Sequence, residues 1–461
     1  TGKERSELRS PLIRGAIWLG MAGLFARGLG ALYRVVLVRL VGAEAIGIFQ
    51  MASPIFRLAL HLSTLGLPGP VAQMTSDALG RARRLQARRV EETGLWLTLL
   101  ATVVTGTLLI LLTPWIGQRL LHDPRSLMTV RVLPLWLLPA ALGTVLRAIA
   151  QGRQMMGDLA ATQSLEQVAR VGAVLGLAAL AIPYGEATVA AAIVAGSAIG
   201  ETVALAILAW RLRLNPPAWR PASVPAVSRS GAFWVVLWSP LTVARSLLRL
   251  ASPLLVLQLV NNLTATINAA LIPRRLQAAG LGSNEATILY GELTGMALPL
   301  LYLPMVAVWP ITQVLMPDLA AQAAQSRWKT VEHRIGRALL LAAGVGLASC
   351  GLLAWQPARI AGLLYGEPQI AGQVRILALS APFAYLNHTL TAALLGLGET
   401  RIPLVTFVVA SALRLGLIQV LVVRPELTIL GAAWAFVADE VLSTLLNGRG
   451  LLRRIRERPA P

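Results

Sequence analysis

The chain opens with two apolar stretches that decide its fold, LIRGAIWLGMAGLFARGLGALYR (residues 12–34) and AIGIFQMASPIFRLALHLSTLGLP (residues 45–68). Each is long enough to cross the hydrocarbon core of a bilayer as a helix. Each also carries arginine, at Arg27, Arg34 and Arg57, and the first stretch contains no acidic residue. An arginine at the bilayer centre costs about 2.5–3.5 kcal/mol on insertion scales. We therefore expect these arginines to face a watery cavity between helices, where they can hold an anion, as in a transporter.

The composition points to the same class. Hydrophobic residues make up 56% of the 461 residues and charged residues only 13%, far less charge than a soluble chain carries. The net charge is +20, but the positive residues lie between apolar spans without interleaved aromatic residues, so we expect no nucleic-acid partner. A phosphate-binding GxxxxGK[S/T] loop, a cysteine–histidine metal cluster and a nucleophile elbow are all missing from the sequence. We expect neither an enzyme nor a bound metal or cofactor.

The apolar runs predict about twelve transmembrane helices. They cover roughly residues 12–34, 45–68, 93–112, 127–149, 163–182, 188–210, 250–272, 289–316, 338–355, 376–396, 402–423 and 428–447. An internal N-terminus would place 24 of the 41 Lys and Arg residues in cytoplasmic loops and 9 in the opposite loops, with 8 in or beside spans. This asymmetry predicts a multi-pass membrane protein with both termini in the cytoplasm.

A proline-rich segment near the middle predicts two lobes. Residues 211–230 contain five prolines and are expected to form a cytoplasmic linker between six-helix lobes at 1–210 and 231–461. Residues 141–172 align without gaps on residues 385–416. This alignment pairs Leu146 with Leu390, Ala148 with Ala392, Gly152 with Gly396, Arg170 with Arg414 and Gly172 with Gly416. An even number of spans per lobe predicts a parallel repeat about an axis normal to the membrane.

The first two spans supply the candidate substrate-binding residues. Arg27 and Arg34 are two helical turns apart and share a face. Ser53, Arg57 and His61 follow at intervals of four, as a polar stripe on an apolar helix. The alternative is that the arginines snorkel or bond to carbonyls of neighbouring helices, and that His61 is a hydrogen-bonded packing residue.

The second half of the chain supplies one further candidate substrate-binding arginine and two of the three acidic residues that could couple transport to an ion. Glycines and prolines interrupt residues 289–316, and interrupted helices at matching places in two halves point to a central site. Glu292 is the clearest acid for coupling to Na⁺ or H⁺ there, with Glu201 and Asp439 as further candidates; all three could instead lie at span ends. Arg414 has no acid four residues before it, so we expect it to face the cavity and bind substrate.

Unlike Arg414, Arg170 has an acidic residue four positions before it, Glu166. This spacing favours an ion pair within one helix. We interpret this pair as structural.

Three stretches resemble one family. They are YRVVLVRLVGAEAIGIFQMASPIFRLALHLSTLGLP (33–68), LIPRRLQAAGLGSNEATILYGELTGMALPLLYLP (271–304) and ALLGLGETRIP (393–403). They are similar to the stage V sporulation protein B-like branch of the MOP exporter superfamily, relatives of the MurJ-like lipid II flippases. The resemblance implies two six-helix lobes that enclose a cationic cavity and alternate in access, as in MATE-like proteins. It implies a diphosphate-binding role for Arg27, Arg34 and Arg57. Flippases of this kind often have an arginine after the acid that matches Glu292, whereas this chain has Leu293.

The leading hypothesis is a flippase that moves an undecaprenyl-pyrophosphate-linked sugar precursor, foremost peptidoglycan lipid II, across the membrane. Its partners would be the lipid-linked oligosaccharide, the bilayer and cell-wall synthesis enzymes. Two alternatives stay open. A cation-coupled multidrug antiporter of the same superfamily would hold cationic drugs with acids, which the first span lacks. A non-transporting scaffold for cell-wall synthesis would have no need of charges within the bilayer.

Overall fold

A computed structural model describes the backbone of residues 11–214 and 240–457. Side chains are described from Gly28 onward, except at residues 31, 240, 253, 254 and 257. Every regular element in these ranges is a helix, which confirms the all-α class for the described part of the chain. Nine helical segments in the described residues are long and apolar enough to cross a membrane. The protein is therefore a multi-pass membrane protein, while the total of twelve spans and the parallel repeat stay predictions.

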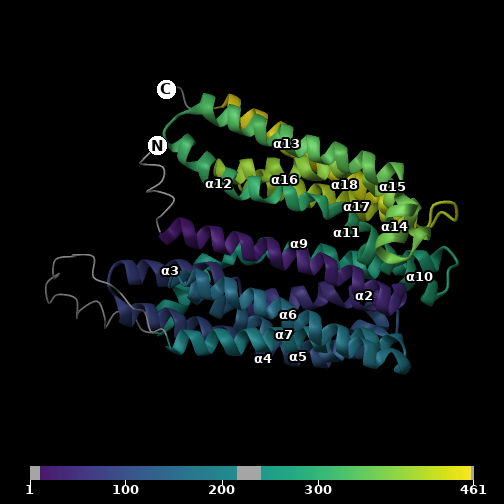
Figure 1. The fold of residues 1–461 in the computed structure, drawn as a ribbon, viewed down its shortest axis with the longest axis horizontal. Coiled ribbons are helices and arrows are strands. Elements are labelled where there is room, and N and C mark those ends of the chain that lie inside the picture. Colours follow the sequence, from purple (N-terminus) through teal and green to yellow (C-terminus); the bar gives the residue numbers. More distant parts are fainter. Residues whose placement is uncertain (1–10, 215–239, 458–461) are drawn as a thin grey trace. The chain divides into compact units, whose positions relative to one another are not determined.

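The first of two compact units contains residues 1–37 and 51–266. Its core is a group of long helices in which α7 packs on both α5 and α6, and α4 packs on α5 (Figure 1). The helices are α3 (Pro68–Gly80), α4 (Arg84–Trp115), η1 (Ile116–Leu120), α5 (Ser126–Gly152), α6 (Met156–Ala181), η2 (Ile182–Tyr184) and α7 (Glu186–Leu214). Parts of α2 (Pro11–Thr64) and of α9 (Pro240–Ala278) complete this unit.

The second unit contains residues 38–50 and 267–461. In it α13 and α18 both pack on α16, and α17 packs on α18. Its elements after α9 are α10 (Ser283–Gly291), η3 (Glu292–Ala297), α11 (Leu298–Tyr302), η4 (Pro304–Ala307), α12 (Trp309–Ala324), α13 (Trp328–Trp355), α14 (Pro357–Tyr365), η5 (Pro368–Ile370), α15 (Ala371–Ala378), α16 (Ala381–Gly396), α17 (Arg401–Leu421) and α18 (Ile429–Arg456).

Helix α2 carries both arginine-bearing stretches and is bent at Gly42, where φ is 76° and ψ is 176°. Glycine adopts this backbone without the clash that a Cβ would cause. The segment Val38–Gln50 around the bend packs in the second unit, whereas both flanks of α2 pack in the first. The helix continues through Pro54, so the bend lies at the glycine. The predicted linker at 211–230 falls largely outside the described residues, and the predicted lobe boundaries stay predictions.

The predicted interruptions are present at both places. Helix α2 ends at Thr64, and Leu65 and Gly66 have φ angles of 51° and 68° before α3 begins. In the second unit, the predicted span at 289–316 consists of short pieces, including the π-helical turn η3. Prolines near the start of α11, η4 and α12 explain the breaks, because proline cannot donate the hydrogen bond that continues a helix. An interrupted helix places polar side chains at a depth where regular packing would exclude them.

Candidate functional site

Four charged side chains from three helices form a buried network in the first unit. Arg147 on α5 donates hydrogen bonds to Glu166 on α6 at 2.9 Å and to Glu201 on α7 at 3.3 Å. Arg170, one turn after Glu166, donates to the other oxygen of that carboxylate and lies 4.0 Å from Glu201. Both carboxylates are almost fully buried. Two arginines and two glutamates balance, which limits the cost of placing charge inside a membrane protein.

Close packing of α7 against α6 brings this network together. A Cβ added to Gly200 would lie 2.6 Å from the Cβ of Arg170, so only glycine allows the approach. The predicted Glu166–Arg170 pair is therefore present, but as half of a larger network. Glu201, predicted as an ion-coupling acid, bonds to Arg147. Arg147 was not among the predicted site residues; its place in a span was the only signal for it.

The first part of α2 lies beside this network. A Cβ on Gly30 would come within 3.4 Å of the side-chain nitrogen of Gln167 on α6. Tyr33 lies within electrostatic range of both Arg34 and Arg170. Arg34 is partly exposed in this region. The side chain of Arg27 lies outside the described part of the structure.

The second part of α2 holds the predicted polar stripe, whose members differ in environment. Ser53 is buried, Arg57 is exposed, and His61 is half-buried with Gln258 of α9 as a hydrogen-bond partner. Phe56 stacks on Trp136 of α5 with 3.8 Å between ring centroids, which fixes the rotation of α2. Because each residue turns the helix by about 100°, Arg57 then leaves the packed face on which Phe56 lies. Ser53 and His61 are therefore packed at least in part against the protein, whereas the side chain of Arg57 is exposed.

In the second unit Arg414 on α17 bonds to Asp439 on α18, and both side chains are largely buried. The guanidinium also lies 4.9 Å from the ring centroid of Phe436, one turn before the acid. Arg414 has no acid four residues before it on α17, as the sequence indicated. Its partner comes from the next helix, which spacing within α17 could not reveal.

A chain of polar side chains continues from this pair. Glu440 accepts hydrogen bonds from the Tyr302 hydroxyl at 3.1 Å and from the Asn387 amide at 3.2 Å. Asn447 then donates to the Asn387 carbonyl at 2.8 Å. None of these residues was among the site residues predicted from the sequence. The signal was available, since Glu440, Thr444 and Asn447 are spaced by four and three on one face of α18.

Glu292 has a different kind of partner from the other two predicted acids. It is buried in the π-helical turn η3 and accepts a 2.9 Å hydrogen bond from the amide of Gln373 on α15. Glu201 and Asp439 each bond to an arginine, whereas the described partner of Glu292 is uncharged. Its charge can therefore change without breaking an ion pair.

The two arginines that the sequence alignment pairs, Arg170 and Arg414, share a structural property. Each bonds to an acid through a terminal nitrogen, and each has a buried Nε–H without an acceptor among the described residues. The following helix supplies Glu201 at 4.0 Å from Arg170, in addition to Glu166, and supplies Asp439 as the partner of Arg414. The two arginines that the sequence alignment pairs thus both lie in largely buried contacts with carboxylates.

Comparison with known proteins identifies the family. The family model described as polysaccharide biosynthesis protein matches residues 12–323, about two thirds of the chain. The chain belongs to this family. Among its relatives is stage V sporulation protein B of Bacillus subtilis, 28% identical over 95% of this chain and 83% of the relative. Lipid II flippase MurJ of the same organism is 27% identical over 36% of this chain and 32% of the flippase.

Solved structures show which fold the family member adopts. An inward-facing multidrug resistance MATE family transporter of the MOP superfamily matches with a TM-score of 0.73 and 16% identity, over 94% of this chain and 96% of that one. At this identity the likeness shows the fold alone. The MATE-like, all-α membrane fold predicted above is thereby confirmed, and the relative named above confirms the predicted resemblance to stage V sporulation protein B.

Proposed function

We propose that this family member is a flippase that carries an undecaprenyl-pyrophosphate-linked sugar precursor, foremost peptidoglycan lipid II, from the inner to the outer leaflet by alternating access. Membership of the polysaccharide biosynthesis family and similarity to a protein named lipid II flippase support this substrate class. The protein would act in the bacterial cytoplasmic membrane with both termini in the cytoplasm, next to the enzymes of cell-wall synthesis that supply the precursor.

The charge imbalance on α2 carries the proposal. This helix contains five arginines and a single glutamate, so its own acid can neutralise at most one of them. The buried arginines in the described parts of α5, α6 and α17 bond to carboxylates of the protein itself. A pyrophosphate carries the oxygen pairs that guanidinium groups bind in bidentate geometry. Arg27, Arg34 and Arg57 would hold the diphosphate, while Ser53 and His61 would contact the attached sugar.

Glu292 is the acid that we assign to energy coupling. A buried carboxyl held by an amide can exchange a proton or bind Na⁺ without leaving an arginine uncompensated, unlike Glu201 and Asp439. Its position in a π-helical turn of an interrupted helix is typical of functional sites. We assign Arg414 to a supporting role toward the substrate, through the polar chain that begins at Asp439.

Translocation of fluorescent lipid II in proteoliposomes tests the proposal. The double variant Arg27→Gln/Arg57→Gln should lower flux at least about tenfold, because a hydrogen bond to a charged group is worth about 1.5–3 kcal/mol. Arg81→Gln is the matched control, since Arg81 is exposed and, among the described residues, its side chain bonds to exposed Asp77 one turn away. Equal flux in the wild type and the double variant would rule out the clamp. Loss of flux in both variants would show that general charge, and not α2, matters.

A further inference from the structure

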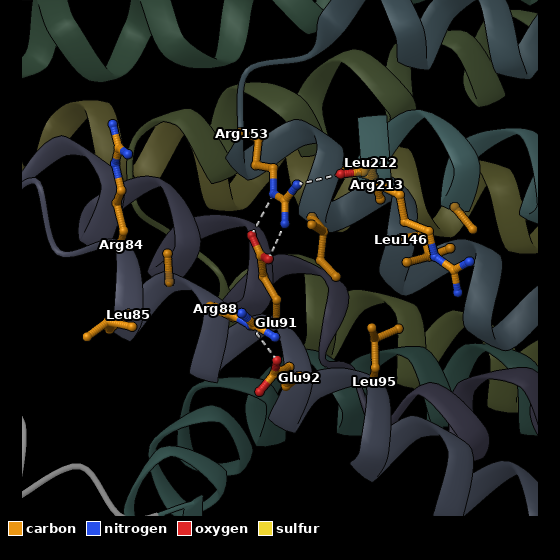
Figure 2. A pocket seen from close by; sticks show the side chains of 13 residues that line it. Arg84, Leu85, Arg88, Glu91, Glu92, Leu95, Leu146, Arg153, Leu212 and Arg213 are labelled. Atoms are coloured by element: carbon orange, nitrogen blue, oxygen red, sulfur yellow. Dashed lines mark hydrogen bonds and ion pairs between the residues drawn. The ribbon is translucent and has the colours of Figure 1, made fainter. Parts of the chain in front are cut away.

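The first unit contains a second candidate binding site, a cavity of about 850 Å³ between α4, α5 and α7. Its lining combines apolar and charged residues. The lining residues that carry the argument are Arg84, Leu85, Leu95, Leu146, Ala209 and Arg213. Figure 2 shows Arg84 and Arg213 on opposite sides of a central ion pair, with leucines below and between them.

A buried ion pair forms the fixed part of the cavity wall. Arg153 donates to Glu91 through Nε at 2.8 Å and through a second nitrogen, and to the carbonyl of Leu212 at 3.2 Å (Figure 2). These bonds connect the end of α5 to α4 and α7. Because the charges of Glu91 and Arg153 cancel, this pair forms part of the cavity wall without adding net charge to it.

Other residues give the cavity its charge. Four arginines and two glutamates line it, which leaves a positive excess of two. Arg88 bonds to Glu92. Arg84 and Arg213 make no hydrogen bond or ion pair with any described residue, and their chemistry suits a phosphate group.

Two tryptophans indicate where the cavity lies along the membrane normal. Trp96 on α4 is 70% exposed, and Trp210 on α7 is 56% exposed. Each directly follows a cavity-lining residue, Leu95 or Ala209. Exposed tryptophans gather where headgroups meet acyl chains. Beyond Trp96, the exposed face of α4 is apolar, with Leu100 64% exposed. The cavity therefore opens at headgroup level beside a surface that suits acyl chains.

The charge distribution also assigns a side of the membrane. The cavity unites residues from three separate parts of the chain, 84–95, 146–153 and 209–213. The excess of Lys and Arg in alternate loops places all three at the cytoplasmic ends of their spans. Basic pockets between membrane helices on this side bind the headgroups of anionic lipids.

We propose that this cavity binds an anionic phospholipid of the inner leaflet, with Arg84 and Arg213 attracting its charged headgroup from opposite sides of the cavity and its acyl chains along α4. Leu146 and Ala209 contact the glycerol end of the lipid. The inference does not depend on the proposed flippase activity, because none of its residues lies on α2 or at Glu292.

Native mass spectrometry of the purified full-length protein tests the site, with phosphatidylglycerol and phosphatidylcholine of identical acyl chains as probes. The wild type should retain phosphatidylglycerol preferentially. Arg84→Gln/Arg213→Gln should reduce that preference about 5-fold for each arginine, since a basic residue near an anionic surface is worth about 1 kcal/mol and 1.4 kcal/mol is tenfold. Arg84→Lys/Arg213→Lys should keep most of it.

The matched control is Arg81→Gln/Arg83→Gln, which removes the same charge from exposed positions outside the cavity. An equal loss in the control, or no loss in the cavity variant, would overturn the proposal. Displacement of the lipid by inorganic phosphate alone would reduce the site to a simple anion site. Should the cavity variant fail to fold, Ala209→Leu fills the apolar wall with every arginine retained; unchanged lipid binding in that variant would also refute the site.

Discussion

Gly47 and Gly291 touch backbone to backbone within the second unit. A Cβ added to Gly291 would lie 2.7 Å from the Cα of Gly47 and 2.5 Å from the carbonyl oxygen of Ala43. A Cβ on Gly47 would lie 2.2 Å from the carbonyl oxygen of Thr287. Two glycines thus allow the bent segment of α2 to pack directly on α10.

Arg39 holds the same segment at a second point. Its Nε donates to the carbonyl of Leu364 at 2.8 Å, and a terminal nitrogen donates to the carbonyl of Leu363. Both carbonyls belong to the last turn of α14, where a cation also interacts favourably with the helix dipole. This attachment therefore holds the segment Val38–Gln50 within the second unit, while both flanks of α2 pack in the first.

Gly47→Ala should destabilise the protein by about 1–3 kcal/mol, the usual cost of adding a methyl group to a filled site. Unfolding of the detergent-solubilised protein in increasing denaturant measures this change. Gly106→Ala is the control, because a Cβ there meets nothing within 4 Å. If both variants are equally stable, the close contact of Gly47 with Thr287 does not exist in solution.

Glu166→Gln should cost about 3–5 kcal/mol of stability, because it leaves two arginines with one carboxylate in a buried network. Glu166→Gln/Arg170→Gln restores the charge balance and should recover part of the loss. The control is Glu92→Gln. Glu92 and its partner Arg88 are both exposed, so the stability of this variant should hardly differ from that of the wild type. Thermal unfolding compares the variants. Equal melting temperatures for Glu166→Gln and Glu92→Gln would show that the network is solvated.

Arg414→Gln should destabilise the second unit by about 3–5 kcal/mol, because it leaves Asp439 uncompensated. Arg414→Gln/Asp439→Asn removes both charges and should regain much of this stability. Lipid II flux in the two variants then separates two roles. Flux that returns with stability identifies a structural pair, whereas flux that stays low in the stable double variant supports contact of Arg414 with substrate.

Glu292→Gln should leave stability nearly unchanged, because glutamine keeps a hydrogen-bonding oxygen for Gln373. It should abolish the dependence of flux on an imposed pH or Na⁺ gradient, since the charge that senses the ion is gone. Flux measured with and without each gradient is the readout. Glu285→Gln is the control, an exposed acid near the start of the same helical segment. An unchanged gradient dependence in Glu292→Gln would remove Glu292 from the coupling mechanism.

Local sequence patterns predicted the helices well. Spans expected at 127–149 and 402–423 correspond to Ser126–Gly152 and Arg401–Leu421. Apolar length and proline position are local properties, so they survive whatever the helix packs against. The spans expected at 12–34 and 45–68 lie on either side of Gly42, whose non-helical backbone angles separate the two helical parts of α2.

Contacts between side chains on different helices could not be predicted from local sequence patterns. Spacing within one helix revealed Glu166 and Arg170 but not Arg147 or Glu201, which come from α5 and α7. The cavity between α4, α5 and α7 likewise unites segments that are far apart in sequence. In each case the partner depends on which faces of the helices pack together, and this is a property of the tertiary structure.

The sequence alone determined that this is an all-helical membrane protein, where its helices break, and that its first helices carry a surplus of arginine. These properties depend on the free energy of each segment in a bilayer, to which every residue contributes locally. Only the tertiary structure decided that Arg414 is neutralised by Asp439, that Glu292 is held by an amide, and that Val38–Gln50 packs apart from the rest of α2. The reason is physical: a buried charge is stabilised by whichever group lies within a few ångströms, and folding alone sets that neighbour.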